Sequence, residues 1–227
     1  MSIDENSEYE RVFNIAKEEI PQLIDLVNGC SRVEQVYLVV DRTVALTKKI
    51  YPKSFCVSCP LTCCINDLFL PVTFIEWKSI ESYLNNKVTQ ETKEKIKRRL
   101  KILPDTLFKD ISSEKNDLRQ YEMNQACPLL IDKKCSIFPF RPVSCRTYGF
   151  YLDGPKRYKS MSQHKTTNTL DACLPELNRW ANIAQNSEEK IYLTPFEQVE
   201  NSLAILNRNK PIKLLIVWLK EYFSSHE

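Results

Sequence analysis

CVSCPLTCC, at residues 56–64, is the stretch that decides how this chain is organised, because it places four thiols within nine residues. Packing of an apolar core does not require such a cluster, whereas thiolates are the preferred ligands of soft metals. A second block downstream supplies Cys127, Cys135 and Cys145, with Cys173 further on. Eight of the nine cysteines therefore fall in two blocks, and the sequence predicts that they hold metal.

The spacing within the first block favours mixed ligation. Cys56 and Cys59 have the Cys-x-x-Cys spacing with which one turn can present two sulfurs to one site. The adjacent Cys63 and Cys64 point to opposite sides of an extended backbone, so they serve one ion only with a strained turn. We therefore expect sulfurs of the first block to join sulfurs of the second, either in two four-sulfur sites or around one cluster that leaves some thiols free. The expected metal ligands are Cys56, Cys59, Cys63, Cys64, Cys127, Cys135, Cys145 and Cys173.

Residues near these cysteines are expected to adjust the centre rather than to bind metal. Arg141 and Arg146 flank Cys145 and could donate hydrogen bonds to sulfur, offsetting the negative charge of several thiolates. His164 lies in a polar stretch and is expected to be an exposed loop histidine. Cys30 stands alone, and we expect it to be a buried thiol without a metal.

The composition excludes several functional classes. Three glycines among 227 residues supply no glycine-rich phosphate loop, which argues against a P-loop or a dinucleotide fingerprint. A net charge of +3 is too mild to imply nucleic acid, and the basic run at 93–101 is expected to be a solvated helix face. The longest apolar run, 214–219, is far short of a membrane span, and the first ten residues do not resemble a secretory signal. We therefore expect a reducing, cytoplasmic location and no membrane or nucleic-acid partner.

Outside the cysteine blocks, apolar residues recur with helical spacing. The sequence predicts a mainly α fold: one domain over residues 1–227, with helices around a small irregular cysteine-rich metal centre and one short β-hairpin at 129–138. Capping boxes are expected at Ser31/Glu34, Thr73/Glu76 and Thr194/Glu197. The expected helices cover about 9–27, 33–50, 73–84, 89–103, 104–121, 175–183, 194–206 and 211–223.

Four segments carry a family resemblance: CVSCPLTCC at 56–64, CPLL at 127–130, CSIF at 135–138 and RPVSCRTY at 141–148. At these residues the chain resembles the zinc- or iron-chelating cysteine-cluster family, the YkgJ-like proteins. The resemblance covers roughly residues 55–150, with Cys173 as a late ligand, and it implies a metal centre formed by these cysteines. Phe138 stands where the family leads us to expect tyrosine.

The function predicted is therefore that of a metal-binding protein, with zinc, iron or an iron–sulfur cluster held by two cysteine blocks. A flagellin lysine methylase carries a similar cysteine block, so the resemblance leaves open a metal-dependent protein-modifying enzyme such as a methyltransferase. A zinc-stabilised module that binds a protein partner is a further alternative. No nucleophile–base pair stands out, so the sequence assigns no catalytic residue.

Overall fold

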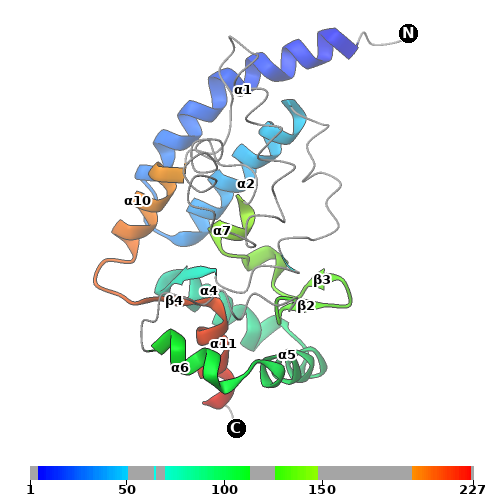
Figure 1. Cartoon of the computed structure of the whole chain (residues 1–227). Helices are drawn as coiled ribbons and strands as arrows, with labels where there is room; N and C mark the ends of the chain where they lie inside the picture. The colour runs from blue at the N-terminus through cyan, green and yellow to red at the C-terminus, as the bar shows by residue number, and fades with distance from the viewer. Residues whose placement is uncertain (1–4, 51–63, 65–69, 113–125, 148–195, 226–227) are drawn as a thin grey trace, which may run out of the picture. The chain divides into compact units, whose positions relative to one another are not determined.

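The computed structural model describes residues 5–50, 64, 70–112, 126–147 and 196–225 (Figure 1). These residues are mostly helical, which confirms the mainly α prediction. Their contacts divide the chain into two compact units, unit 1 (Met1–Pro60 and Val143–Arg208) and unit 2 (Leu61–Pro142 and Asn209–Glu227). A single domain around a cysteine-rich centre stays a prediction. Across the described ranges, no helix is long and apolar enough to cross a bilayer.

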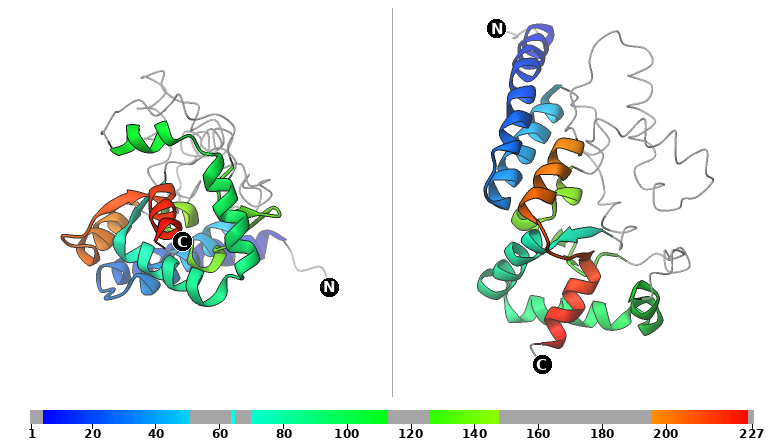
Figure 2. Two further views of the ribbon diagram at one scale, coloured as in Figure 1. Left: turned by 90° about the horizontal axis from the view of Figure 1, so that it is seen from below. Right: turned by 90° about the vertical axis from the view of Figure 1, so that its left-hand side faces the viewer.

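Unit 1 is built on two long helices, α1 (Glu5–Asn28) and α2 (Val33–Ile50), close to the ranges predicted. Each helix buries one apolar face against the other, and the apolar residues on that face recur with helical spacing. The one-turn helix α7 (Val143–Arg146) packs on α2. The helix α10 (Phe196–Leu206) lies beside α1 and α2 (Figure 2). The α1–α2 core contains Ala16, Ile20, Leu23, Ile24, Leu46 and Ile50.

The connection between α1 and α2 is fixed by local hydrogen bonds. Gly29 N–H donates to the carbonyl of Leu26 at 3.1 Å, which closes α1 at Asn28-Gly29. Ahead of α2, the Gln35 side-chain oxygen accepts from Ser31 N at 2.8 Å and from Arg32 N at 3.1 Å. These are two amides that a helix start would otherwise leave unpaired, and the sequence did not predict Gln35 in this capping role.

Unit 2 combines helices with two short antiparallel sheets. Strand β1 (Pro71–Thr73) pairs with β4 (Ile212–Leu214), and Val72 lies opposite Lys213. Three helices follow β1 along the chain, and α11 (Leu215–Ser224) follows β4. The three are α4 (Phe74–Lys87), α5 (Gln90–Ile102) and α6 (Asp105–Ser112).

The prediction that the last helix begins at Pro211 was wrong. Residues 212–214 form β4, and the helix starts at Leu215. The cause is pairing with the distant β1, where Leu215 N–H donates to Leu70 O at 2.9 Å and Phe74 N–H donates to Pro211 O at 3.1 Å. These ladder contacts replace the helical bonds that the apolar spacing alone favours.

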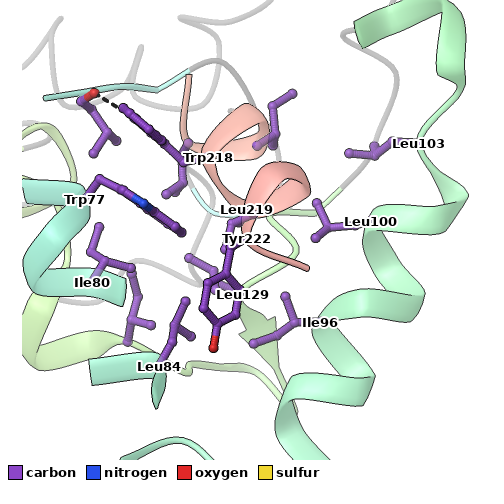
Figure 3. Packing of buried hydrophobic residues seen from close by; sticks show 14 of the residues in the cluster. Trp77, Ile80, Leu84, Ile96, Leu100, Leu103, Leu129, Trp218, Leu219 and Tyr222 are labelled. Carbon is purple, nitrogen blue, oxygen red and sulfur yellow. Dashed lines mark hydrogen bonds between the residues drawn. The ribbon is translucent and has the colours of Figure 1, made fainter. Parts of the chain in front are cut away.

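The core of unit 2 lies where α4, α5 and α11 meet (Figure 3). Trp77 and Trp218 stack with ring centroids 5.6 Å apart, and Trp218 Nε1–H donates to the Val72 carbonyl at 3.1 Å. The predicted capping box at the start of α4 is confirmed, with both Thr73 and Glu76 buried. The core around these contacts includes Ile80, Leu84, Ile96, Leu100, Leu129, Leu219 and Tyr222.

The predicted short hairpin is also confirmed. Strands β2 (Leu130–Ile131) and β3 (Lys134–Cys135) pair across a two-residue turn, followed by the 3₁₀ helix η3 (Phe138–Phe140). Both turn residues are left-handed, with φ of 49° at Asp132 and 61° at Lys133, the backbone that a tight two-residue hairpin needs. The expected helix at 175–183, the end of that at 104–121 and the residues 194–195 lie outside the described ranges.

Candidate metal centre

Four of the eight expected ligands lie in the described part of the chain. Cys64, Cys127 and Cys135 belong to unit 2 and Cys145 belongs to unit 1, and all four are half-buried. The other expected ligands, Cys56, Cys59, Cys63 and Cys173, lie outside the described residues.

A backbone hydrogen bond joins the two cysteine blocks. The amide of Cys127 donates to the carbonyl of Cys64 at 2.6 Å, although 62 residues separate them in the sequence. Both residues belong to unit 2, so the contact lies within one compact body. The main chains of the two cysteine blocks are therefore in contact at Cys64 and Cys127, one expected ligand from each block.

The β2–β3 hairpin carries Cys135, and a backbone hydrogen bond ties its first strand to Cys127. Leu130 N–H donates to Cys127 O at 2.9 Å, and Cys135 lies opposite Leu130 in the β2–β3 register. Ser136 N–H donates to Leu129 O at 2.8 Å, which continues the pairing past the strands. Residues 127–136 are thus held by their own backbone bonds, a fixed frame for two thiols.

Residues 127–136 pack against the apolar core of unit 2. Cys127 and Cys135 both pack against the apolar cluster that contains Leu129, and Leu129 itself is 1% exposed. From α5, the Arg99 guanidinium donates to Cys127 O at 3.4 Å. A rigid apolar wall beside thiolates limits the access of water, which strengthens metal–sulfur interactions.

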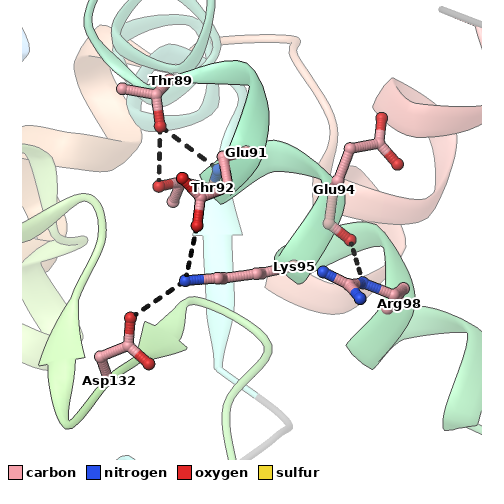
Figure 4. Close-up of polar contacts among 7 residues, drawn as sticks. All are labelled: Thr89, Glu91, Thr92, Glu94, Lys95, Arg98 and Asp132. Carbon is pink, nitrogen blue, oxygen red and sulfur yellow. Dashed lines mark hydrogen bonds and ion pairs between the residues drawn. The ribbon is translucent and has the colours of Figure 1, made fainter.

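Lys95 of α5 contacts the turn of the hairpin through the exposed side chain of Asp132 (Figure 4). Lys95 Nζ lies 3.2 Å from Asp132 Oδ2 and 3.0 Å from Glu91 Oε1. The hydrogen bonds to these carboxylates raise the pKa of the Lys95 ammonium, and the bond to Glu91 has the larger effect. The carboxylates are largely exposed, so this bridge orients the hairpin turn and adds little to stability.

The two arginines beside Cys145 occupy different surroundings. The Arg141 guanidinium lies 4.1 Å from the ring centroid of Phe138, which is 57% exposed. The Arg146 guanidinium is buried in unit 1, where it pairs with Asp41 and lies 4.1 Å from the ring centroid of Tyr37. The sequence led us to expect both at the sulfurs, and it gave no signal for Asp41 or Tyr37, which lie on α2 more than a hundred residues earlier.

The described donors do not by themselves complete a site. Within the described ranges, no three side chains of histidine, cysteine, aspartate or glutamate lie close enough together to hold an ion. His164 lies outside those ranges. The donor chemistry available is thiol sulfur on a rigid frame, which suits zinc and iron, metals that proteins bind through four cysteines.

Comparison with protein families gives a match to the model described as "CxxCxxCC: Putative zinc- or iron-chelating domain", over residues 55–174. This range is more than half of the chain, so the chain belongs to this zinc- or iron-chelating family. The matched range encloses all eight expected ligands and excludes Cys30. No curated protein and no solved structure matches the chain.

Proposed function

We propose that this protein binds zinc or iron through the thiolates of its two cysteine blocks, and that sulfurs of the first block share a metal with sulfurs of the second. The observation that carries the proposal is the hydrogen bond between Cys127 and Cys64, which joins the blocks inside the family-matched range. The proposed ligands are Cys56, Cys59, Cys63, Cys64, Cys127, Cys135, Cys145 and Cys173.

The backbone contact supports a shared metal for one cysteine of each block. Zinc–sulfur bonds are about 2.3 Å long, so two sulfurs on one tetrahedral ion lie about 3.8 Å apart. A cysteine side chain has only one carbon between backbone and sulfur, so residues that share a metal need adjacent backbones. Cys64 and Cys127 meet that condition, since their main chains are in direct hydrogen-bond contact.

Either metal is consistent with this donor set, and each would supply a different chemistry. A zinc ion closed by four thiolates stabilises the fold, whereas an open coordination position gives a Lewis acid. An iron–sulfur cluster transfers electrons. The protein's own contribution is the same in each case: rigid thiolates beside an apolar wall.

The first experiment is metal and sulfide analysis, with an absorption spectrum, on full-length protein purified without oxygen. Cys64→Ser and Cys127→Ser are each expected to lose most of the bound metal. Cys30→Ser is the matched control, because Cys30 is also a half-buried thiol but lies outside the family-matched range. Wild-type protein without zinc or iron, or full metal in both ligand variants, would contradict the proposal.

The spectrum also separates the functional alternatives. Iron with acid-labile sulfide indicates a cluster and directs the search to redox chemistry. Iron without sulfide, or a metal that retains an exchangeable water, favours an enzyme that modifies protein. Colourless protein with stoichiometric zinc closed by thiolates favours a structural role in an interaction module.

Mixed ligation has its own test. Peptides covering residues 55–64 and 127–145 are each expected to bind zinc more weakly than the whole protein, because neither contains the full ligand set. Equal affinity of one peptide and the intact chain would show that a single block closes its own site.

A further inference from the structure

Arg146 is a buried cation whose partners lie on a different helix. Its side chain is 3% exposed, and burying a guanidinium is unfavourable unless it is paired. The pairing comes from the Asp41 carboxylate and from the face of the buried Tyr37 ring, 4.1 Å from the guanidinium carbon. One partner accepts hydrogen bonds at the edge of the guanidinium and the other covers its face, so its orientation is defined.

The segment that carries Arg146 has little support of its own. Helix α7 is four residues long, and a single helical turn is not stable in isolation. After Arg146, the amide and the hydroxyl of Thr147 both donate to Val143 O, at 3.0 and 2.8 Å. These bonds close the turn on itself, while packing on α2 determines where the turn lies.

Cys145 occupies the preceding position in the same turn. Consecutive side chains on a helix diverge by about 100°, so the Cys145 side chain leaves the helix in a direction different from that of Arg146. The ion pair with Asp41 therefore acts on Cys145 through the backbone of α7.

We propose that Arg146 is a positioning residue for the ligand Cys145, and that its contacts with Asp41 and Tyr37 set the metal affinity of that thiolate. The inference rests on the proposed function. Binding coupled in this way is reciprocal: if the pairing with α2 favours metal, metal must favour the pairing. Residues that orient ligands typically change metal affinity by about 10- to 100-fold when they are altered.

The test compares two substitutions that each remove one carboxylate charge, one on α2 and one on α1. Asp41→Asn removes the charge that pairs with Arg146 and keeps the side-chain shape. Glu19→Gln is the matched control, because Glu19 pairs with Arg42 of α2 at 2.7 Å, so this substitution removes an ion pair between α1 and α2. Zinc affinity of each full-length protein is measured anaerobically by competition with a chromophoric chelator.

Asp41→Asn is expected to bind zinc about tenfold or more weakly than wild type, whereas Glu19→Gln is expected to bind as wild type does. Circular dichroism of both variants, compared with wild type, is the check that neither substitution unfolds the protein. Arg146→Lys keeps the charge but loses the planar stack on Tyr37, so an intermediate affinity is expected. Equal zinc affinity of Asp41→Asn and Glu19→Gln would overturn the inference.

A second measurement reads the coupling in the other direction. Hydrogen exchange of the α2 amides around Tyr37 and Asp41 is expected to slow when zinc is added to wild type, and to be unchanged by zinc in Cys145→Ser. Equal slowing in both proteins would refute the link through Cys145. Failure of wild type to bind any zinc or iron would instead overturn the proposed function, so the two failures are distinguishable.

Discussion

The buried capping box at the start of α4 permits a quantitative prediction. Thr73 Oγ1–H and Thr73 N–H donate to Glu76 Oε2 at 2.8 and 3.0 Å, and Glu76 N–H donates back to Thr73 Oγ1 at 3.4 Å. Thr73 is 8% exposed and Glu76 is 2% exposed, so water cannot replace a lost partner. Thr73→Val keeps the side-chain shape and removes both bonds of the hydroxyl.

The expected cost has two parts. Loss of an N-cap hydroxyl costs about 1 kcal/mol, and loss of a hydrogen bond to a charged group costs about 1.5–3 kcal/mol. We therefore expect Thr73→Val to lower the free energy of unfolding by about 3 kcal/mol. Thr89 caps α5 by accepting from Thr92 N at 3.3 Å, but it is exposed. Thr89→Val is therefore the matched control, with an expected cost of about 0.5–1 kcal/mol.

The assay is urea unfolding at saturating metal, followed by tryptophan fluorescence, which reports on the stacked Trp77 and Trp218 in the same unit. Glu76→Gln completes a double-mutant cycle with Thr73→Val. The two costs should add to more than the cost of the double variant, because both substitutions remove the same contact. Thr73→Val costing no more than Thr89→Val would refute the reasoning from burial.

Three further predictions concern unit 2. Leu129→Ala should lower the unfolding free energy by about 2–5 kcal/mol in the same urea assay, because the side chain is fully buried; a loss below about 1 kcal/mol would contradict the packing described. Burial, and to a smaller extent the Glu81 carboxylate, raise the pKa of Tyr222 in the folded protein. The neutral phenol therefore stabilises the fold fully below the unfolded pKa of about 10, and this contribution is lost as the pH rises through the raised pKa of the folded state. Tyr222→Phe should therefore show less alkaline loss of stability between about pH 9 and 12, and identical profiles would refute this. Lys95→Gln should leave the free energy of unfolding in urea unchanged, because the partners of Lys95, Glu91 and Asp132, are exposed. A clear decrease in that free energy would contradict this prediction.

Features encoded within a few residues were predictable from the sequence. The Thr73/Glu76 box, the start of α5 after Thr89 and the hairpin at 130–135 each depend on neighbours along the chain, and each is confirmed. The resemblance of the four segments at 56–64, 127–130, 135–138 and 141–148 predicted the family, which the match over 55–174 confirms. Local chemistry determines these features, so one sequence contains the necessary information.

Features that depend on distant partners were not predictable. Apolar spacing predicts a helix from residue 211, because the partner of strand β4 is β1, about 140 residues earlier, and spacing does not reveal such pairing. The pairing of Arg146 with Asp41, 105 residues away in the sequence, was not predicted, and the expected hydrogen bond from Arg146 to sulfur stays a prediction. The ligand set of eight cysteines stays a prediction, since four of them lie outside the described ranges.

The pairing of β1 with β4 has a consequence for biosynthesis. Trp218 and Leu219 come from α11, so the core of unit 2 cannot close until the ribosome has released residues far beyond the last cysteine block. Translation proceeds at about 5–20 residues per second, so the thiols at 56–64 and 127–145 emerge several seconds before the tertiary frame around them is complete. A nascent chain in that interval exposes nucleophilic sulfur to oxidants and to competing ions. Supply of metal during synthesis, rather than after release, would shorten the time for which these thiols are exposed.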